Sequence, residues 1–306
     1  MDRCAPGRLN RLAQRQGVDG ATYLNIGHAN LSGDVLSVFG GGTACVVMVH
    51  DLIPITHPDL VAPTQPANFA GRIGRVRRHA SHVIANSRAT ATALGDHWTG
   101  TDRVPPITVA PLGADHFTRV DAARDPLHFV MLGTIEPRKN HGLMIDVWEA
   151  LATEYPADQM PQLHIIGLPG WRGEALMDRL ERHMLRGTAI HLHGGLPDTE
   201  MRAHLARANA LLFPSITEGY GFPPLEAAMA GATPVCSDLA VFHETLGDCG
   251  VYVDNPTAYH WKETIKQLID DKVRVPDPTD VKVQTWQEHF EIVAESVISQ
   301  DVRGRS

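Results

Sequence analysis

The sequence has few cysteines, no excess of positive charge and no long apolar run. Its four cysteines are far apart and form no CxxC pair, so they predict free thiols in a reducing compartment, with Cys45 and Cys236 buried. A formal net charge of −8 and the lack of a long basic tail argue against general affinity for nucleic acid. No run approaches the roughly 18 consecutive apolar residues of a membrane-spanning helix.

The length and composition are those of a globular chain. With 306 residues, 43% of them hydrophobic, we expect one large or two medium domains with well-filled cores. Residues 1–7 lack the apolar core of a secretion signal. We therefore expect a cytoplasmic protein, with peripheral attachment to the inner face of the membrane as an alternative.

From about residue 127, strand-like and helix-like segments alternate. The expected strands are residues 127–132, 162–166, 189–193, 210–213, 233–236 and 251–253. The expected helices are residues 140–154, 173–185, 198–207, 225–230 and 239–246. This alternation predicts an α/β fold, a parallel sheet covered by helices on both faces. Ligands bind such sheets beyond the carboxyl ends of the strands, where the loops at 133–139, 167–171, 194–197 and 218–224 are expected.

The first part of the chain is less regular. The expected strands there are residues 21–26, 44–49, 82–85 and 107–110, and the expected helices are 3–16, 68–80 and 88–98. Residues 113–126 are polar and broken by Asp and Pro, which indicates a linker. Residues 275–285 are again loop-like, and an amphipathic helix is expected at about 286–298.

The most informative segment is residues 218–226, EGYGFPPLE. It follows an apolar strand and precedes a helix that we expect to open near Pro224, because proline is tolerated in a first helical turn. The two glycines let backbone approach a ligand closely, and the free N–H groups of a helix N-terminus suit an anion. Glu218 and Glu226 are predicted to face one crevice. The pattern indicates a site for a phosphorylated, polyhydroxylated ligand.

In this context the segment resembles the paired-glutamate motif of retaining glycosyltransferases with the GT-B fold, specifically family 4, the mannosyltransferase-like glycosyl transferases group 1. Four other segments extend the resemblance. Residues 133–140 (GTIEPRKN) are similar to the first strand-loop of the donor domain, and residues 192–198 (LHGGLPD) to its base-binding loop. Residues 49–54 (VHDLIP) resemble the loop with the active-site histidine, and residues 83–87 (VIANS) a strand end at the interdomain cleft.

The resemblance implies two Rossmann-like parallel-sheet domains facing a cleft, the first abbreviated at its N-terminus. Residues 1–118 would form the acceptor-side domain and residues 119–284 the donor-binding domain. Residues 285–306 would form a C-terminal helix that packs back on the first domain.

The resemblance also implies an activity. The enzyme would transfer a hexosyl group from a nucleotide-diphosphate sugar to a glycan or lipid-linked acceptor in polysaccharide biosynthesis, with retention of configuration. GDP-mannose is favoured weakly over UDP sugars. No metal and no further cofactor are required, and nucleic acid is not a partner.

The implied catalytic residues are His50, Glu218 and Lys139. Lys139 would contact the diphosphate, Glu218 the hydroxyls of the sugar, and Glu226 the ribose. The implied donor-binding residues are Gly133, Thr134, Arg138, Leu196, Gly219, Tyr220, Gly221, Phe222, Leu225 and Glu226. Thr134 stands where the family often has an arginine, five positions before the lysine, and Arg138 would supply part of the missing charge.

Several of these residues and two neighbouring features also have an ordinary structural interpretation. Arg138 and Lys139 also fit a solvated helix start, and Glu226 the favourable charge of a helix N-terminus. His50 after a strand is often structural, and Asp51 beside it can cap a turn. The basic run Arg72, Arg75, Arg77 and Arg78 is either a solvated helix face or a docking surface for anionic lipid headgroups.

The histidines do not predict a metal site. No HExxH motif or Cys/His set has metal-ligand spacing among the 17 histidines. His191 and His193 are expected to face opposite sides of their strand.

Two other functions compete with transfer. The first is a catalytically impaired module that binds nucleotide sugar, because the family's N-terminal glycine loop is absent and Gly40-Gly41-Gly42 precedes a strand. The second is a GT-B sugar-nucleotide epimerase, disfavoured because its histidine and carboxylate pattern is not evident.

Overall fold

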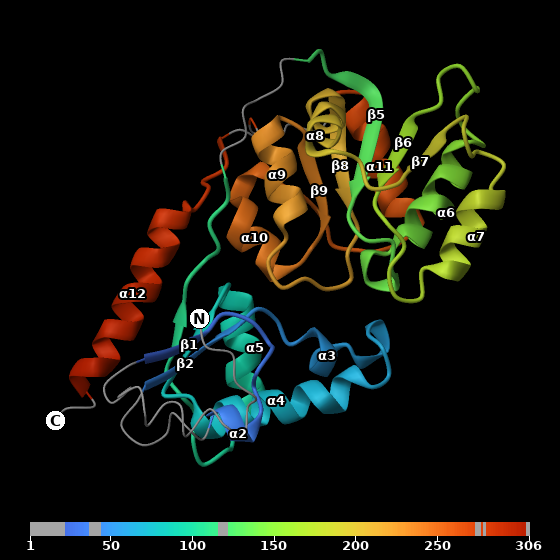
Figure 1. Cartoon of the computed structure of the whole chain (residues 1–306). Helices are drawn as coiled ribbons and strands as arrows, with labels where there is room; N and C mark the ends of the chain where they lie inside the picture. Colours follow the sequence, from blue (N-terminus) through green and yellow to red (C-terminus); the bar gives the residue numbers. More distant parts are fainter. Residues whose placement is uncertain (1–21, 37–43, 116–121, 273–276, 278–279, 304–306) are drawn as a thin grey trace. The chain divides into compact units, whose positions relative to one another are not determined.

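The computed structural model describes residues 22–36, 44–115, 122–272, 277 and 280–303, and the chain divides into two compact units (Figure 1). Unit 1 consists of Met1–Ala114 and Gln284–Ser306, and unit 2 of Asp115–Val283. The predicted helix at residues 3–16 and the Gly40–Gly42 run lie outside the described residues. Within the described ranges, no helix has the length and apolar character needed to cross a membrane.

Unit 1 contains a four-stranded parallel sheet with the strand order β1-β2-β3-β4. The strands are β1 (Thr22–Asn25), β2 (Ala44–Val49), β3 (His82–Ala85) and β4 (Ile107–Val109). Strand β2 is an almost continuous apolar run, as expected for a strand buried on both faces. The four strands predicted for this part of the chain are confirmed to within one residue at each end.

Helices cover the sheet of unit 1. They are α2 (Gly33–Leu36), α3 (Ile53–Thr56), α4 (Gln65–His79), α5 (Arg88–Trp98) and α12 (Trp286–Arg303), with the 3-10 turn η3 (Pro58–Leu60). Helix α4 begins three residues before its predicted start, because Pro66 is accommodated within its first turn. Helix α12 covers the sheet face that carries Val46 and Ile84, where its Val293 packs with these two residues in one cluster.

Unit 2 contains a six-stranded parallel sheet with the order β10-β9-β8-β5-β6-β7. The strands are β5 (Asp125–Leu132), β6 (Gln162–Ile166), β7 (Ile190–His193), β8 (Ala208–Phe213), β9 (Thr233–Ser237) and β10 (Val251–Val253). In chain order this is the 3-2-1-4-5-6 arrangement of doubly wound nucleotide-binding sheets. The order reverses between β5 and β8, so the loops after these two strands flank the expected ligand crevice.

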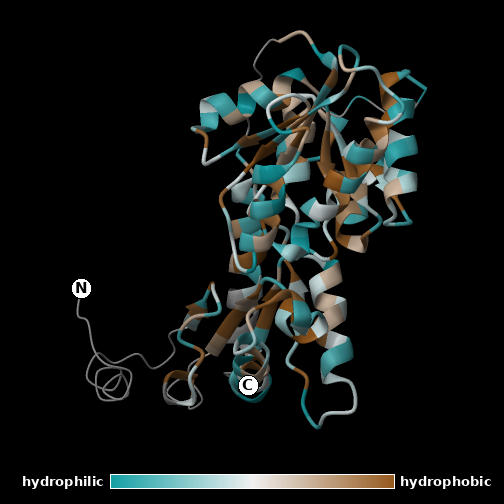
Figure 2. Ribbon diagram, turned by 90° about the vertical axis from the view of Figure 1, so that its right-hand side faces the viewer, coloured by the Kyte–Doolittle hydropathy of each residue, from teal (hydrophilic) through white to brown (hydrophobic). Residues whose placement is uncertain are grey.

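The main core of unit 2 lies on one face of this sheet. Phe129 of β5 and Leu163 of β6 pack there against the buried Trp148 of α6 and Trp261 of α11. The helices of the unit are α6 (His141–Leu151), α7 (Glu174–Arg182), α8 (Asp198–Arg207), α9 (Phe222–Ala230), α10 (Ala240–Leu246) and α11 (Ala258–Ile269), with 3-10 turns η4 (Pro137–Lys139) and η5 (Gly247–Cys249). Hydrophobic colour concentrates on the strands, and hydrophilic colour on the outer helical surfaces (Figure 2).

Two predictions for unit 2 need correction, and one helix was missed. Helix α9 begins at Phe222 and not near Pro224, because both prolines fit within its first turn. Helix α11 was not predicted. His191 and His193 share one face of β7 and do not face opposite sides, since side chains two residues apart in a strand point the same way.

Candidate functional site

Lys139 reaches the switch point through a short turn after β5. Gly133 follows the strand with φ of 132°, a backbone conformation that favours glycine. The chain then forms η4, and Asn140 takes the left-handed conformation before α6 begins. Lys139 is thereby buried, with 8% of its surface exposed.

Glu218, in the loop after β8, binds both basic residues of the β5 loop. Its Oε1 lies 2.6 Å from Lys139 Nζ and 2.7 Å from Arg138 Nη1. Arg138 Nη2 also lies 2.7 Å from Glu136 Oε1. The Ile216 N–H donates to the Arg138 carbonyl at 2.9 Å, so a backbone bond holds the two loops together. Lys139, Arg138 and Glu218, here called the switch-point ion cluster, therefore form one hydrogen-bonded group.

The electrostatics of the cluster follow from its burial. Burial lowers the pKa of Lys139, and the neighbouring Glu218 carboxylate opposes that change. Lys139 Nζ also lies 4.2 Å from the centroid of the Phe213 ring, a cation–π contact that favours the charged form. A charge-assisted hydrogen bond contributes about 1.5–3 kcal/mol net, so the cluster holds its cations in place.

The glycine loop is shaped by a position that only glycine fits. Gly221 caps α9 with φ of 92°, and a Cβ built there would lie 2.6 Å from Phe242 Cε1. The first four N–H groups of a helix lack intrahelical acceptors, and Pro223 and Pro224 have no N–H to offer. The N–H group of Phe222 therefore remains for an anion at this end of α9.

Glu226 lies on α9 and belongs to a different set of charges. It is half-buried, and among the described residues no ion pair includes it. Burial raises its pKa, while Arg202 of α8 lowers it and Asp198 raises it. The structure thus brings together Lys139, Arg138 and Glu218, and places Glu226 next to α8.

The other predicted loops of unit 2 contact one another at the carboxyl ends of β5, β6 and β7. Ile135 and Pro169 form a parallel bridge, and a Cβ at Gly167 would lie 2.0 Å from the Gly133 carbonyl oxygen. Thr134 is exposed on the β5 loop, and Leu196 is half-buried after β7. The loops expected to converge on one rim do so.

In unit 1, His50 follows β2 and makes structural contacts. Its Nε2 lies 2.8 Å from the Ile26 carbonyl oxygen, and its backbone N–H donates to His28 Nε2 at 3.2 Å. Asp51 accepts the Ile53 N–H at 2.9 Å, as a turn cap. His28 was missed from the sequence; burial lowers its pKa, and Asp51 opposes that change.

Three buried polar atoms near the predicted segments were also missed. Among the described residues, Asn86 Oδ1, His141 Nδ1 and Ser215 Oγ are buried without a hydrogen-bond partner. Asn86 follows β3, Ser215 follows β8, and His141 opens α6 directly after the switch-point ion cluster. Their positions beside expected ligand-binding loops were readable from the sequence, but their burial was not.

The buried His141 predicts a pH-dependent stability. Burial, with Lys139 as a second cause, lowers the pKa of His141 from 6.5 to about 4. Between these values the unfolded chain binds a proton that the folded protein excludes. The contribution of His141 to the free energy of unfolding is therefore fully present above about pH 6.5. It falls by roughly 3 kcal/mol as the pH approaches 4. Urea unfolding at pH 7 and pH 4.5 should show a smaller loss for His141→Asn than for the wild type, by about 2–3 kcal/mol.

The exposed His97 of α5 provides the matched control. His97→Asn should show the same loss of stability as the wild type, because this substitution removes no buried ring. Equal acid sensitivity of His141→Asn and the wild type would contradict the prediction.

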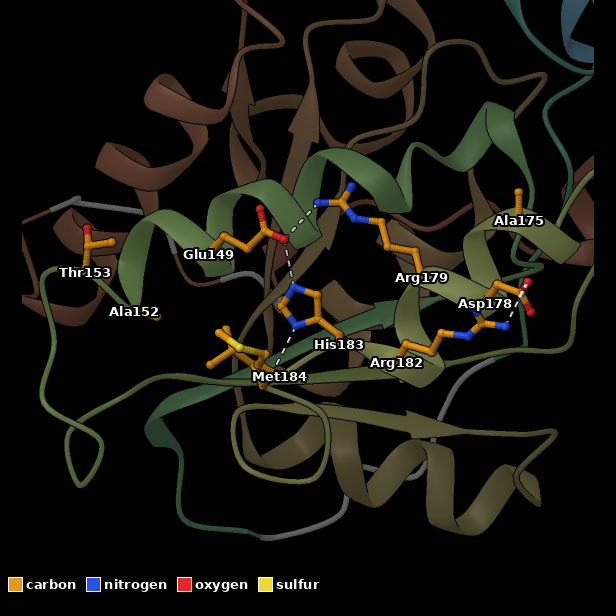
Figure 3. Close-up of a pocket in the computed structure, with 10 residues that line it drawn as sticks. Glu149, Ala152, Thr153, Ala175, Asp178, Arg179, Arg182, His183 and Met184 are labelled. Atoms are coloured by element: carbon orange, nitrogen blue, oxygen red, sulfur yellow. Dashed lines mark hydrogen bonds and ion pairs between the residues drawn. The ribbon is translucent and has the colours of Figure 1, made fainter.

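A separate cavity of about 780 Å³ is lined by residues of α6, of α7 and of the segments that follow these two helices (Figure 3). Its polar groups pair with one another: Arg179 lies 3.1 Å and His183 2.8 Å from the same oxygen of Glu149. None of the residues predicted from the sequence lines this cavity.

Comparison with protein families identifies a match over more than half of the chain. The model of the family described as "Glycosyl transferases group 1" matches residues 115–283. The serotype-specific mannosyltransferase WbdA of Escherichia coli is 24% identical over 278 residues, which cover 84% of this chain and 34% of WbdA. The chain thus spans about a third of the length of this curated relative.

Solved structures share the fold. One is the apo form of the lipopolysaccharide outer core galactosyltransferase WaaB, with a TM-score of 0.69 and 14% sequence identity. The match covers 96% of this chain and 79% of the WaaB chain. Anabaena HepE in complex with UDP and glucose matches 96% of this chain and 84% of its own with a TM-score of 0.66 and 17% identity. These likenesses confirm the GT-B fold expected from the sequence.

Proposed function

Because the chain belongs to the glycosyl transferases group 1 family, we propose that it transfers a hexosyl group from a nucleotide-diphosphate sugar to a glycan or lipid-linked acceptor, with retention of configuration. The observation that carries the proposal is the switch-point ion cluster, in which Lys139 and Arg138 converge on Glu218 within 2.7 Å. The cluster lies at the carboxyl ends of β5 and β8, where doubly wound sheets bind nucleotides.

The two cations and the α9 N-terminus serve the departing diphosphate. Cleavage of the bond between the sugar and the diphosphate leaves negative charge on the phosphate oxygens. Lys139 and Arg138 stabilise that charge, and so does the N–H group of Phe222. The nearly buried position of Lys139 makes this interaction stronger than it would be in water.

The two glutamates serve different parts of the donor. Both cations contact Oε1 of Glu218, so Oε2 is the oxygen that we expect to accept a hydroxyl of the transferred sugar. Glu226 lies on α9 beside α8. It accepts the ribose hydroxyls, a task for an ionised carboxylate. Leu196 and Thr134 border the nucleotide from the neighbouring loops.

Retention needs no protein nucleophile in this proposal. The acceptor hydroxyl attacks on the face from which the diphosphate leaves, and the leaving phosphate takes the acceptor proton. The proton and the leaving group are then both accounted for by the substrates, and no metal or further cofactor is part of the scheme.

The donor and the setting are proposed from weaker signals. WbdA is a mannosyltransferase, which supports GDP-mannose, whereas the HepE structure holds UDP and glucose. We also propose a cytoplasmic protein that is attached peripherally to the inner face of the membrane. The exposed Arg72 and Arg78 of α4 would then contact anionic lipid headgroups. Arg75 and Arg77 are engaged within unit 1, by the Leu31 carbonyl and by Asp102.

A nucleotide-sugar panel tests the function. The full chain is incubated with GDP-mannose, other GDP sugars and UDP sugars, and thermal stability and release of nucleoside diphosphate are measured. One donor should raise the unfolding midpoint, since a ligand that binds only the folded state stabilises it by about 2.7 kcal/mol at 100 times its Kd. The same donor should release nucleoside diphosphate when a glycan or lipid-linked acceptor is added.

The anomeric configuration of the product, read by NMR, separates retention from inversion. An inverted product would overturn the retaining mechanism. Binding of a donor without turnover, across all acceptors, would favour the alternative of a nucleotide-sugar-binding module. Failure of every nucleotide sugar to shift the midpoint would overturn the proposal as a whole.

A further inference from the structure

Five histidines of unit 2 lie together on the sheet face opposite its main core. They are His128 of β5, His164 of β6, His191 and His193 of β7, and His204 of α8. Their strand neighbours Phe129, Leu163 and Ile190 belong to the main core, so the strand histidines point away from it. Helix α8 packs over this face of β5 and brings His204 to the group.

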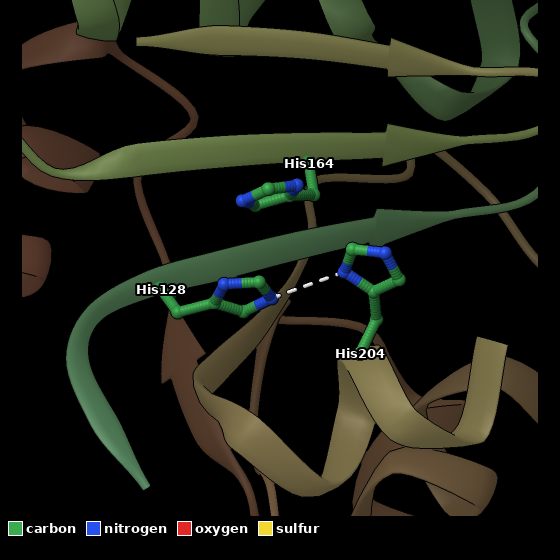
Figure 4. Close-up of side chains that lie close together, drawn as sticks. All are labelled: His128, His164 and His204. Carbon is green, nitrogen blue, oxygen red and sulfur yellow. Dashed lines mark hydrogen bonds between the residues drawn. The ribbon is translucent and has the colours of Figure 1, made fainter. Parts of the chain in front are cut away.

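Three of these side chains have metal-ligand proximity (Figure 4). One imidazole nitrogen from each of His128, His164 and His204 lies within 4.8 Å of the other two. His128 Nε2 and His204 Nδ1 are 3.3 Å apart. In a tetrahedral zinc site with bonds of 2.0–2.1 Å, two ligand nitrogens are about 3.3 Å apart. One edge of such a site therefore already exists.

We propose that His128, His164 and His204 bind one divalent transition-metal cation of the Zn²⁺ class, with the fourth position open to water. The donor set consists only of imidazoles, which suit Zn²⁺, Co²⁺, Ni²⁺ and Cu²⁺, whereas Mg²⁺ and Ca²⁺ prefer oxygen ligands. Three histidines plus a water form a known zinc coordination pattern.

The protonation state of the rings favours coordination. Burial, reinforced by neighbouring histidines, lowers the pKa of His128 to about 4 and that of His164 to about 2. At neutral pH both rings are uncharged and keep a lone pair. His193 Nε2 lies 3.0 Å from His164 Nδ1, so a hydrogen bond there leaves His164 Nε2 as the ligand.

Metal binding requires the histidine rings to turn, and the surrounding charges do not oppose it. The rings of His128 and His164 are stacked with centroids 4.1 Å apart, so coordination turns them about χ2, a soft torsion for histidine. Arg207 is the cation that acts on His128 and His204, and Asp125 pairs with it at 3.8 Å. Glu200 adds a second negative charge near His204, so a cation meets no net repulsion.

Cobalt titration tests the site in the tag-free chain of 306 residues after treatment with a chelator. We expect a visible d–d spectrum that saturates at one Co²⁺ per chain, and displacement by Zn²⁺ but not by Mg²⁺. Each of His128→Gln, His164→Gln and His204→Gln should weaken binding by at least about tenfold, since the loss of even an outer-shell partner costs 10- to 100-fold. His97→Gln, on the exposed surface of α5, should leave the affinity unchanged.

A second measurement needs no variant. Zn²⁺ should slow amide hydrogen exchange in β5, β6 and α8 of the wild-type chain, because the cation ties these three elements together. No cobalt spectrum, unchanged affinity in all three variants, or protection confined to other elements would overturn the proposal. Neither readout uses a nucleotide sugar, so the metal site and the proposed transfer can fail independently.

Discussion

Replacing Lys139 by methionine is expected to lower donor turnover by about 10²- to 10³-fold, the usual cost of removing one preorganised group that stabilises transition-state charge. Methionine keeps an unbranched stem in the same buried position and removes only the cation. Glu218 retains Arg138 as a partner at 2.7 Å, so the loop is expected to stay folded. The measurement is release of nucleoside diphosphate from the donor that binds best in the nucleotide-sugar panel.

The matched control is Lys272→Met. Lys272 pairs with Asp270, but its side chain is 68% exposed, and such surface pairs contribute little. We expect wild-type turnover for this variant. If Lys139→Met also retains turnover within about threefold of the wild type, Lys139 does not stabilise the leaving diphosphate.

The sheet of unit 2 was predictable because buried parallel strands are nearly continuous apolar runs between helix signals. All six of its strands were expected, with differences of at most two residues at their ends. Helix α11 was missed although its signal was present: Trp261, Ile265 and Leu268 recur at helical spacing and are buried. The sheet order was not predictable, because it depends on which strands pair across long connections.

The site was predictable only as far as chain topology carries it. Residues after β5 and β8 had to meet at the carboxyl edge of a parallel sheet, which placed Lys139 and Glu218 near each other. That Lys139 and Arg138 bind the same oxygen of Glu218 depends on side-chain placement and could not be derived from spacing. The position of Glu226 beside Arg202 and Asp198 depends in the same way on how α8 packs on α9.

The histidine cluster shows a different limit. Its members come from four elements between residues 128 and 204, and no short motif connects them. The error over His191 and His193 hid the fact that two of the five clustered histidines share one strand face. The proposed ligands His128, His164 and His204 come together only because the strand order places β5 beside β6 and α8 packs over β5.

Replacing Glu218 by glutamine is expected to destabilise unit 2 by about 3–5 kcal/mol, the usual cost of removing one partner from a buried ion pair. The side chains of Glu218 and Lys139 are 8% and 9% exposed. Water therefore cannot solvate the Lys139 cation that the substitution leaves without its carboxylate partner. Glutamine keeps the shape and one oxygen acceptor, so the loss reports the charge rather than a cavity. Thermal and urea unfolding of unit 2 measure the effect.

A double-mutant cycle separates this ion pair from other effects of the substitution. When Lys139→Met is combined with Glu218→Gln, the buried cation disappears with its partner, so the double variant should be at least about 1 kcal/mol more stable than the sum of the single losses predicts. Arg138 keeps Glu136 as its partner at 2.7 Å in that variant. Glu181→Gln, at an exposed position of α7, should change stability by no more than about 0.5 kcal/mol. Additive losses would mean that Lys139 and Glu218 do not stabilise each other.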